Sequence, residues 1–345
     1  MTRRAPTLED VAREAGVSRA TVSRVVNGVR NVDPALRELV RRAIEQTGYA
    51  PNRAARSLVT RRAEAVALVV SGAGPDPAEH QAFAARVFAD PFFGRVVAGV
   101  VDHLRPRSVH PVLMFAESAE DRQEILTCLR QGRADGALVV STHADDPLPA
   151  LLAERRLPAV LFARPARPVP LSCVDLDHRD GGRLAAEHLL ARGCRRPATV
   201  AGPLDVGASR ERLAGFRDAL ARHGRPDPPV EEGGFTFDSG VTAMTRLLAA
   251  HPEVDGVFAA NDLMAQGACQ VLREHGRRVP GDVAVVGFDD SGVAAACRPS
   301  LTTIRQPVER MAARMACLLD EHIRGERTEP ACVVFDPELV VRDSA

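Results

Sequence analysis

The sequence predicts an all-α three-helix head followed by an α/β body of two doubly wound parallel-sheet lobes. Residues 7–48 contain helix-capping residues and apolar residues at helical spacing, whereas residues beyond 62 alternate short apolar runs with amphipathic stretches. Charge separates the same two parts, because residues 1–62 carry 13 arginines against 6 acidic residues within a chain of zero net charge. The head therefore favours a polyanionic partner, and the body does not.

The chain opens with two helices joined by a tight turn. Thr7 and Asp10 form a capping pattern before apolar residues at helical spacing, and Gly16 permits a left-handed turn. Ser18 can cap the second helix. The apolar faces consist of Leu8, Val11, Ala12 and Ala15 in the first helix and Val22, Val25 and Val26 in the second. This arrangement predicts a helix-turn-helix.

A third helix is predicted from Asp33, as its N-cap, to Gly48, just past its end, with Pro34 in the first helical position. Its apolar stripe should close the core of the head; the stripe comprises Leu36, Leu39, Val40, Ala43 and Ile44.

The second helix of a helix-turn-helix enters the major groove with the residues near its N-terminus. Arg19 can bond guanine bidentately, and Ala20 can meet a thymine methyl group. The other candidates for base or phosphate contacts are Ser18, Thr21, Ser23, Arg24 and Asn27. The alternative is an ordinary helical hairpin with solvated arginines, against which the excess positive charge argues.

Residues 49–62, "YAPNRAARSLVTRR", have the pattern of a short helix with few apolar residues to bury. An isolated helix of about eight residues is marginal in water. We therefore expect residues 52–59 to become helical only against a partner: the same segment of a second subunit and the minor groove of DNA.

The body alternates apolar runs typical of buried parallel strands with amphipathic helices. The expected strands are 65–71, 111–116, 134–141 and 158–163 in a first series and 172–176, 197–202, 256–260 and 283–288 in a second. The expected helices lie near 92–105, 120–131, 147–156, 179–192, 209–223, 238–250 and 261–276.

Ligands of doubly wound sheets bind beyond the carboxyl ends of strands. Seven polar residues meet this criterion, and Phe235 could offer a stacking face; the seven are Ser71, Arg164, Ser209, Arg212, Asn261, Asp262 and Asp289. Such a set suits a small polyhydroxylated ligand in a cleft between the lobes, such as a sugar or a nucleoside. Taken singly, each could instead be a helix cap or a surface ion pair.

Motifs for catalysis, metals and membranes are missing from the sequence. It has no P-loop, no G-x-S-x-G and no HExxH, and it has no apolar run long enough to span a membrane. The seven cysteines form no CxxC pair, and we expect buried thiols rather than a disulfide or a metal site. We expect a cytoplasmic protein, associated with the nucleoid, that is not an enzyme and has no cofactor. The alternative is a cytoplasmic sugar- or nucleoside-binding protein or enzyme whose head binds another protein.

The segment "TLEDVAREAGVSRATVSRVVNG" and the following "VDPALRELVRRAIEQTGYAPNRAARSLVTRR" resemble the head of the LacI/GalR transcriptional regulators. The likeness extends through "VDLDHRDGGRLAAEHL", "SRERLAGFRDAL", "FAANDLMAQGA", "VAVVGFDDSG" and "PSLTTIRQP". It implies a dimeric regulator, most simply a repressor, with a periplasmic-binding-protein-like body that takes a sugar-like or purine-like effector and controls binding to a palindromic DNA operator.

The resemblance also implies roles for particular residues. The implied DNA contacts comprise those already named in the second helix together with Thr7, Tyr49, Asn52, Ala55, Arg56 and Leu58, the last as a minor-groove wedge. The implied effector contacts are Arg212, Phe235, Asn261 and Asp289, with Ser209, Gln306, Phe92 and Phe93 beside them.

The family fold implies a head at 1–50, a hinge at 51–62 and a body at 63–345. Within the body, we expect an N-lobe of about 63–165 and 304–330, and a C-lobe of about 166–303 and 331–345. An extra stretch near 72–89 borders the expected pocket. The C-terminus lacks the leucine heptads that tether some members into tetramers, so a homodimer is expected.

Overall fold

The computed structural model describes residues 6–26, 31–49, 62–72, 83–143 and 145–345. By its internal contacts, the chain divides into two compact units, Met1–Glu64 and Ala65–Ala345. The first holds the head and the second holds the body. Five expected DNA contacts lie outside the described residues, namely Asn27, Asn52, Ala55, Arg56 and Leu58, as does most of the stretch near 72–89.

The head contains the three expected helices: α1 (Leu8–Ala15), α2 (Arg19–Val26) and α3 (Pro34–Thr47). Thr7 and Asp10 form a reciprocal capping box on α1, and Asp33 caps α3. Gly16 and Gly48 end their helices in the left-handed region. The oxygen of the Ser18 side chain accepts a hydrogen bond from the backbone N–H of Thr21, as a cap of α2 does. The capping residues therefore set the helix boundaries.

The core of the head is smaller than the apolar stripe of α3 predicts. Val11, Ala15, Val22, Val40 and Ala43 are buried together. Leu36 and Leu39 are exposed, so the expectation that they close this core is wrong. Both precede the buried residues of α3, Val40 and Ala43, along the helix.

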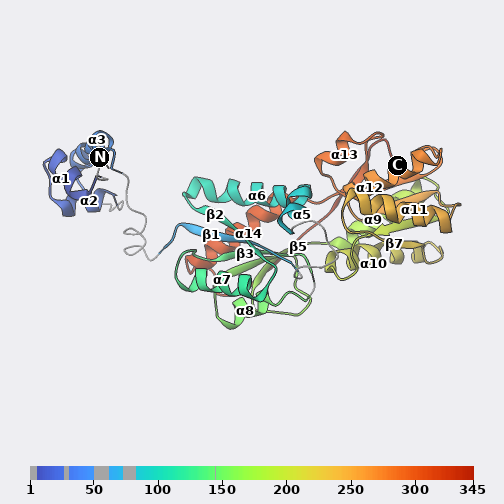
Figure 1. Ribbon diagram of the computed structural model, residues 1–345, viewed down its shortest axis with the longest axis horizontal. Helices are drawn as coiled ribbons and strands as arrows, with labels where there is room; N and C mark the ends of the chain where they lie inside the picture. The colour runs from blue at the N-terminus through green and yellow to red at the C-terminus, as the bar shows by residue number, and fades with distance from the viewer. Residues whose placement is uncertain (1–5, 27–30, 50–61, 73–82, 144) are drawn as a thin grey trace. The chain divides into compact units, whose positions relative to one another are not determined.

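The N-lobe is a six-stranded parallel sheet in the order β11-β5-β4-β3-β1-β2. Its strands are β1 (Ala65–Ser71), β2 (His110–Ala116), β3 (Ala137–Ser141), β4 (Ala159–Phe162), β5 (Ser172–Leu176) and β11 (Cys332–Phe335). Its helices are α5 (Phe83–Ala89), α6 (Pro91–Leu104), α7 (Ala119–Arg130), α8 (Leu148–Glu154) and α14 (Val308–Ile323), with a single 3-10 turn η1 (Arg105–Arg107). Alternate residues of β1 enter two cores, one with α6 and α14 and the other with α7 and α8. The sheet is therefore covered on both faces (Figure 1).

The C-lobe is a second six-stranded sheet, ordered β12-β10-β9-β8-β6-β7, in which only β12 runs antiparallel to its neighbour. Its strands are β6 (Pro197–Ala201), β7 (Val230–Glu232), β8 (Gly256–Ala259), β9 (Ala284–Asp289), β10 (Thr302–Arg305) and β12 (Glu338–Val340). Its helices are α9 (His178–Ala191), α10 (Gly207–Arg222), α11 (Phe237–Ala250), α12 (Asp262–Glu274) and α13 (Gly292–Ala296). Helices α9 and α10 pack on one face, and α11 and α12 pack on the other.

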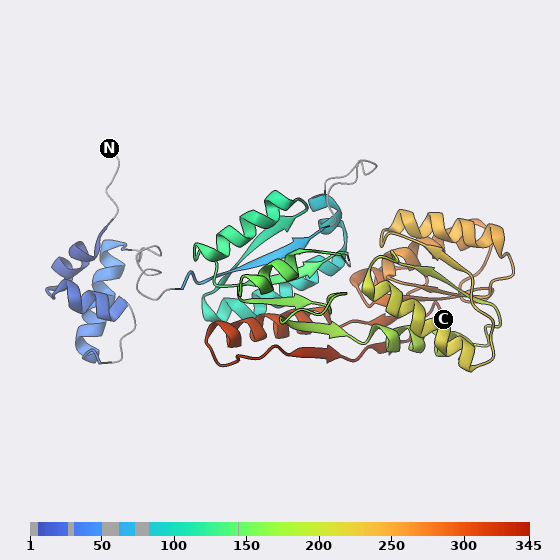
Figure 2. The ribbon, with the colours of Figure 1, turned by 90° about the horizontal axis from the view of Figure 1, so that it is seen from below.

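Strand pairing places the lobe boundaries differently from the sequence prediction. Strand β5 pairs with β4, and β11 pairs with β5, so both belong to the N-lobe (Figure 2). The expected start of the C-lobe near 166 and its second part from 331 are therefore wrong. The chain crosses after Leu176, returns between Arg305 and Val308, and crosses again after Phe335.

The same pairing corrects the expectation for two cysteines. Cys173 of β5 and Cys332 of β11 are direct partners in the parallel register, with Cα atoms 4.6 Å apart, and they form a disulfide. The other five cysteines are free thiols: Cys194, Cys269 and Cys297 are buried, and Cys128 and Cys317 are half-buried. The two sulfurs lie within bonding distance because strands from distant parts of the sequence are neighbours in the sheet.

Candidate DNA-binding face and effector cleft

In the head, the N-terminal turn of α2 presents a polar, accessible surface. Ser18, Arg19, Ala20 and Arg24 are exposed, and Thr21 and Ser23 are half-buried. The Nε atom of Arg19 lies 3.1 Å from a carboxylate oxygen of Glu9, yet its side chain is 69% exposed. An ion pair this exposed contributes little stability, so the guanidinium can exchange Glu9 for a base or a phosphate.

Two other expected DNA contacts have structural partners in the head. The hydroxyl of Thr7 bonds the carboxylate of Asp10 in the capping box, and Tyr49 packs against the core. Only the remaining surface of each side chain is open to another molecule.

In the body, a cleft of about 870 Å³ opens between the two lobes. Eight of the residues predicted from the sequence line it: Phe92, Phe93 and Arg164 from the N-lobe, Arg212, Phe235, Asn261 and Asp289 from the C-lobe, and Gln306 from the crossover. The strand-end rule selected Arg164, Arg212, Asn261 and Asp289, and these residues from two lobes meet in one cleft. Gln306, Phe92 and Phe93 were implied by the family resemblance alone.

Arg212 of α10 is the central cation of the cleft. Its side chain is buried, with the guanidinium carbon 3.6 Å from the centre of the Phe288 ring. It donates hydrogen bonds to the backbone oxygen of Ala260 and to Oε1 of Gln306, the latter at 3.3 Å, and its Nη2 lies 3.9 Å from Oδ1 of Asp289. These contacts fix the guanidinium in one orientation.

Asn261 is fixed at both ends of its amide. Its Oδ1 accepts the backbone N–H of Met264 and so caps α12, while its Nδ2 donates to the backbone oxygen of Phe235 at 2.9 Å. Phe235 itself has a positive φ of 62°, an unusual backbone for a phenylalanine. The amide therefore holds the aromatic side of the cleft in place.

The two expected serine contacts do not reach the cleft. Ser71 is fully buried at the end of β1, where its hydroxyl lies 3.5 Å from the backbone oxygen of Ala116. Ser209 is buried under Phe235 and Gly202, and its hydroxyl has no hydrogen-bond partner. Ser71 ends β1 and Ser209 lies in the first turn of α10, but neither is among the residues that line the cleft.

The sequence reading missed several lining residues. They include Asp90, Thr142, His143, Asp146, His178, Arg210 and Asp238, together with Phe83 and Val87 of α5 in the extra stretch. Thr142 and His143 directly follow β3, so the strand-end rule could have found them. Asp90 caps α6 through Oδ1, which accepts the backbone N–H of Phe92 at 2.9 Å.

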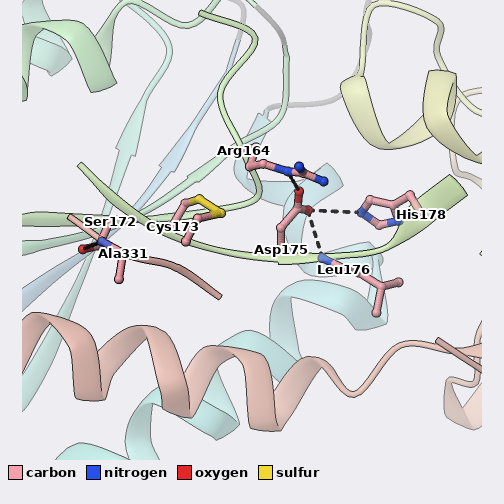
Figure 3. Close-up of a disulfide and its surroundings, with 8 residues drawn as sticks. Arg164, Ser172, Cys173, Asp175, Leu176, His178 and Ala331 are labelled. Carbon is pink, nitrogen blue, oxygen red and sulfur yellow. Dashed lines mark hydrogen bonds and ion pairs between the residues drawn. A yellow bond between two sulfur atoms is a disulfide. The ribbon is translucent and has the colours of Figure 1, made fainter. Parts of the chain in front are cut away.

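His178 lies beside the carboxylate of Asp175, as Figure 3 shows, and also contacts the central arginine. Its Nδ1 accepts from Nε of Arg212 at 3.3 Å, and its Nε2 lies 3.8 Å from Oδ1 of Asp175. The other carboxylate oxygen of Asp175 accepts from Arg164 at 2.7 Å. Burial, with the Arg212 cation beside it, holds the pKa of His178 well below its usual value. Because Nδ1 accepts from Arg212, the neutral ring carries its proton on Nε2, on the side of Asp175.

The charges of the cleft are nearly balanced, and its central pair, Arg212 and Asp289, is buried. Burial raises the pKa of the carboxyl groups of Asp90 and Asp289, and the nearby Arg212 cation opposes both increases. Four aspartates and three arginines line the cleft. An uncharged ligand rich in hydroxyl groups can bond these fixed charges without adding another buried charge.

Neither a metal site nor a membrane-spanning helix is found among the residues that the structure describes. In the described part of the chain, no group of three or more His, Cys, Asp or Glu side chains could hold a metal ion. Among the described helices, none has both the length and the apolarity to cross a membrane.

Comparison with known proteins gives the chain close relatives along its whole length. It is 48% identical over 347 residues to the HTH-type transcriptional regulator CelR of Thermobifida fusca, with 99% of each chain covered. The chain belongs to the LacI family. A model of bacterial regulatory proteins of the lacI family matches residues 7–52, and a model of the periplasmic binding protein-like domain matches residues 186–345.

Solved structures of LacI-family regulators agree with this assignment. The structure of a CelR–cellobiose complex matches with a TM-score of 0.76 at 46% identity, covering 99% of this chain and 100% of that one. The lac repressor dimer bound to operator and the anti-inducer ONPF matches with a TM-score of 0.83 at 29% identity, covering 99% of both. This LacI-family protein is a DNA-binding transcriptional regulator and not an enzyme.

Proposed function

We propose that this regulator binds a palindromic operator as a homodimer in the cytoplasm, at the nucleoid, and that cellobiose or a closely related uncharged disaccharide controls it. The observation that carries the effector proposal is the cleft: a fixed, buried Arg212 beside Asn261, Asp289 and Gln306, among phenylalanine rings. Aromatic faces with a few oriented polar groups are the usual chemistry of sugar binding. The likeness to the CelR–cellobiose complex supports the same ligand.

A dimer is supported from both units of the chain. One recognition helix contacts few base pairs, so two symmetric heads reading a palindrome supply the specificity. In the body, the edge strand β2 exposes Val112 and Leu113, whose side chains are 45% and 38% accessible. A second copy of the chain would cover this apolar edge.

Effector binding would change the arrangement of the two lobes and thereby the spacing of the paired heads. Coupling of this kind is reciprocal, so the cellobiose affinity of the operator-bound protein must differ from that of the free protein. The test first selects an operator from random duplex DNA with the full-length protein. Calorimetry then measures the cellobiose affinity of the free protein and of the operator-bound protein. Equal affinities would contradict the coupling, and no binding would contradict the choice of effector.

We expect Arg19→Ala to weaken binding to the selected operator by about 1–3 kcal/mol and to relax preference at one base pair. The reason is the exposed guanidinium at the start of α2. The measurement is fluorescence anisotropy with the operator and its single-base variants. Arg41→Ala, which removes an equally exposed arginine from α3, is the control. Unchanged base preference in Arg19→Ala would remove this residue from base reading.

We expect cellobiose 6′-phosphate to bind at least about tenfold more weakly than cellobiose, because a phosphate adds roughly two negative charges. The cleft already holds more carboxylates than arginines, and Arg164 is paired with Asp175. Calorimetry with both sugars makes the comparison, and glucose 6-phosphate serves as the charge control. Tighter binding of the phosphorylated disaccharide would show that the cleft is built for an anion.

A further inference from the structure

We propose that Arg95 on α6 is a positioning residue that couples the effector cleft to the N-lobe. This inference rests on the function proposed above, because it concerns how a ligand in that cleft acts. Arg95 does not line the cleft, and the sequence reading gave it no role.

The guanidinium of Arg95 joins the two lobes. Its Nη1 donates to the backbone oxygen of Asp289, at the end of a C-lobe strand, at 2.8 Å. Its Nη2 donates to the backbone oxygen of Gln306, in the crossover, at 3.0 Å. The carboxylate of Glu309 on α14 accepts from Nε at 2.6 Å and from Nη2 at 2.9 Å. The side chain is only 19% exposed, so these bonds are largely shielded from water.

Both backbone acceptors belong to cleft residues that Arg212 contacts from the other side. Arg212 lies near the carboxylate of Asp289 and donates to the side-chain oxygen of Gln306. Two arginines therefore hold Asp289 and Gln306. Arg212 contacts their side chains, which line the cleft, and Arg95 binds their backbone oxygens from behind. A ligand that shifts these side chains must also shift the acceptors of Arg95.

The turn that Arg95 holds has an unfavourable backbone. Asp289 has a φ of 101° and Asp290 a φ of 51°, both in the region that disfavours residues other than glycine. Asp262 holds the far side of the turn, because its carboxylate accepts the backbone N–H of Ser291 at 2.7 Å. Arg95 holds the near side, so its bond helps to keep the Asp289 carboxylate directed at the cleft.

On the N-lobe side, Arg95 acts on a rigid pair of helices. A Cβ placed on Gly99, one turn further along α6, would lie 2.2 Å from the backbone oxygen of Glu309. Helices α6 and α14 thus meet at backbone contact and should move together (Figure 1). The first turn of α6 carries Phe92 and Phe93 into the cleft wall. If the turn at Asp289 moves, its hydrogen bond to Arg95 should therefore shift α6, and α14 should move with α6.

The experiment compares full-length Arg95→Ala and Arg95→Lys with Arg107→Ala. Arg107 is the matched control because it also joins the α6 segment to α14, at the opposite end of the two helices, by pairing with Asp320 at 3.5 Å, but it binds no C-lobe atom in the contacts of the described residues. The coupling factor is the ratio of the cellobiose Kd of operator-bound protein to that of free protein. Amide hydrogen exchange of residues 288–292 and 304–308 in the free protein is measured in parallel.

In Arg95→Ala we expect the two cellobiose Kd values to differ by a factor at least about fivefold smaller than in the wild type. The factor for Arg95→Lys should lie between these two, and the factor for Arg107→Ala should equal that of the wild type. Amide exchange of residues 288–292 and 304–308 should be faster in Arg95→Ala than in the wild type, and it should be unchanged in Arg107→Ala. A wild-type coupling factor retained in Arg95→Ala would overturn the proposal. If the wild-type protein ignores cellobiose, the effector assignment fails separately, and exchange then decides: unchanged protection in Arg95→Ala overturns the role of Arg95, and lost protection supports it.

Discussion

Arg212→Met should weaken cellobiose binding by at least about 100-fold, which corresponds to roughly 2.7 kcal/mol. The substitution keeps an unbranched side chain that replaces the aliphatic part of arginine but removes the central cation of the cleft. It also removes the donors that hold Gln306 and the backbone oxygen of Ala260. Hydrogen bonds between a sugar hydroxyl and a charged group are each worth about 1.5–3 kcal/mol, so the loss of one or two accounts for the effect.

The design must separate binding from stability, because Arg212→Met leaves the carboxylate of Asp289 buried without its cation. Breaking a buried pair by removing one partner typically costs about 3–5 kcal/mol. The double variant Arg212→Met/Asp289→Asn removes both charges and should recover part of the thermal stability without recovering cellobiose affinity. Arg222→Ala, which removes an exposed arginine of the same helix outside the cleft, is the control and should bind cellobiose as the wild type does. Affinity of the double variant within tenfold of the wild type would contradict the central role of Arg212.

Many cleft residues could be predicted from the sequence because they lie at strand ends, and apolar runs in the sequence locate those ends. Asn261 and Asp289 follow apolar runs directly, and parallel sheets collect such residues at one edge. The rule gives the position of a residue but not the direction of its side chain. Ser71 and Ser209 do not line the cleft for this reason, since their short hydroxyl groups are buried inside the protein.

The lobe boundaries could not be predicted from chain order, because sheet membership is decided by pairing between distant segments. Strand β5 extends the sheet of β4, and β11 returns to it from 159 residues further along the chain. Nothing local in residues 172–176 distinguishes the two sheets. The disulfide and the role of His178 were missed for the same reason, since both depend on where β5 lies.

Arg95 illustrates a different limit. Its sequence neighbourhood resembles that of any arginine on an amphipathic helix, and a solvated side chain is the ordinary expectation. Only the crossing of α6 with the C-lobe turn gives it two backbone acceptors. The capping residues of the head are the opposite case: Thr7, Asp10 and Asp33 act within a few residues of themselves, and sequence alone located them.

Gly215→Ala should lower the stability of the body by about 3 kcal/mol, at the upper end of the 1–3 kcal/mol that overpacking typically costs. Helices α9 and α10 cross at two glycines. A Cβ on Gly215 would lie 1.8 Å from the backbone oxygen of Arg179, and one on Gly182 would lie 2.0 Å from the backbone oxygen of Arg212. Backbone cannot move aside by changing rotamer, so the helices must separate. Thermal denaturation followed by circular dichroism should show the melting temperature of the body falling by roughly 5–10 °C.

Gly94→Ala is the matched control, since it makes the same chemical change within α6, where an added Cβ meets nothing within 4 Å. Replacing a helical glycine by alanine without strain stabilises a protein by about 0.4–1 kcal/mol. The two substitutions should therefore have opposite signs. Because Gly182 contacts the backbone of Arg212 itself, separation of α9 from α10 in Gly215→Ala should also draw Arg212 away from His178 and weaken cellobiose binding. A destabilised Gly215→Ala that kept its full cellobiose affinity would show that the helix crossing supports the fold without positioning the central arginine.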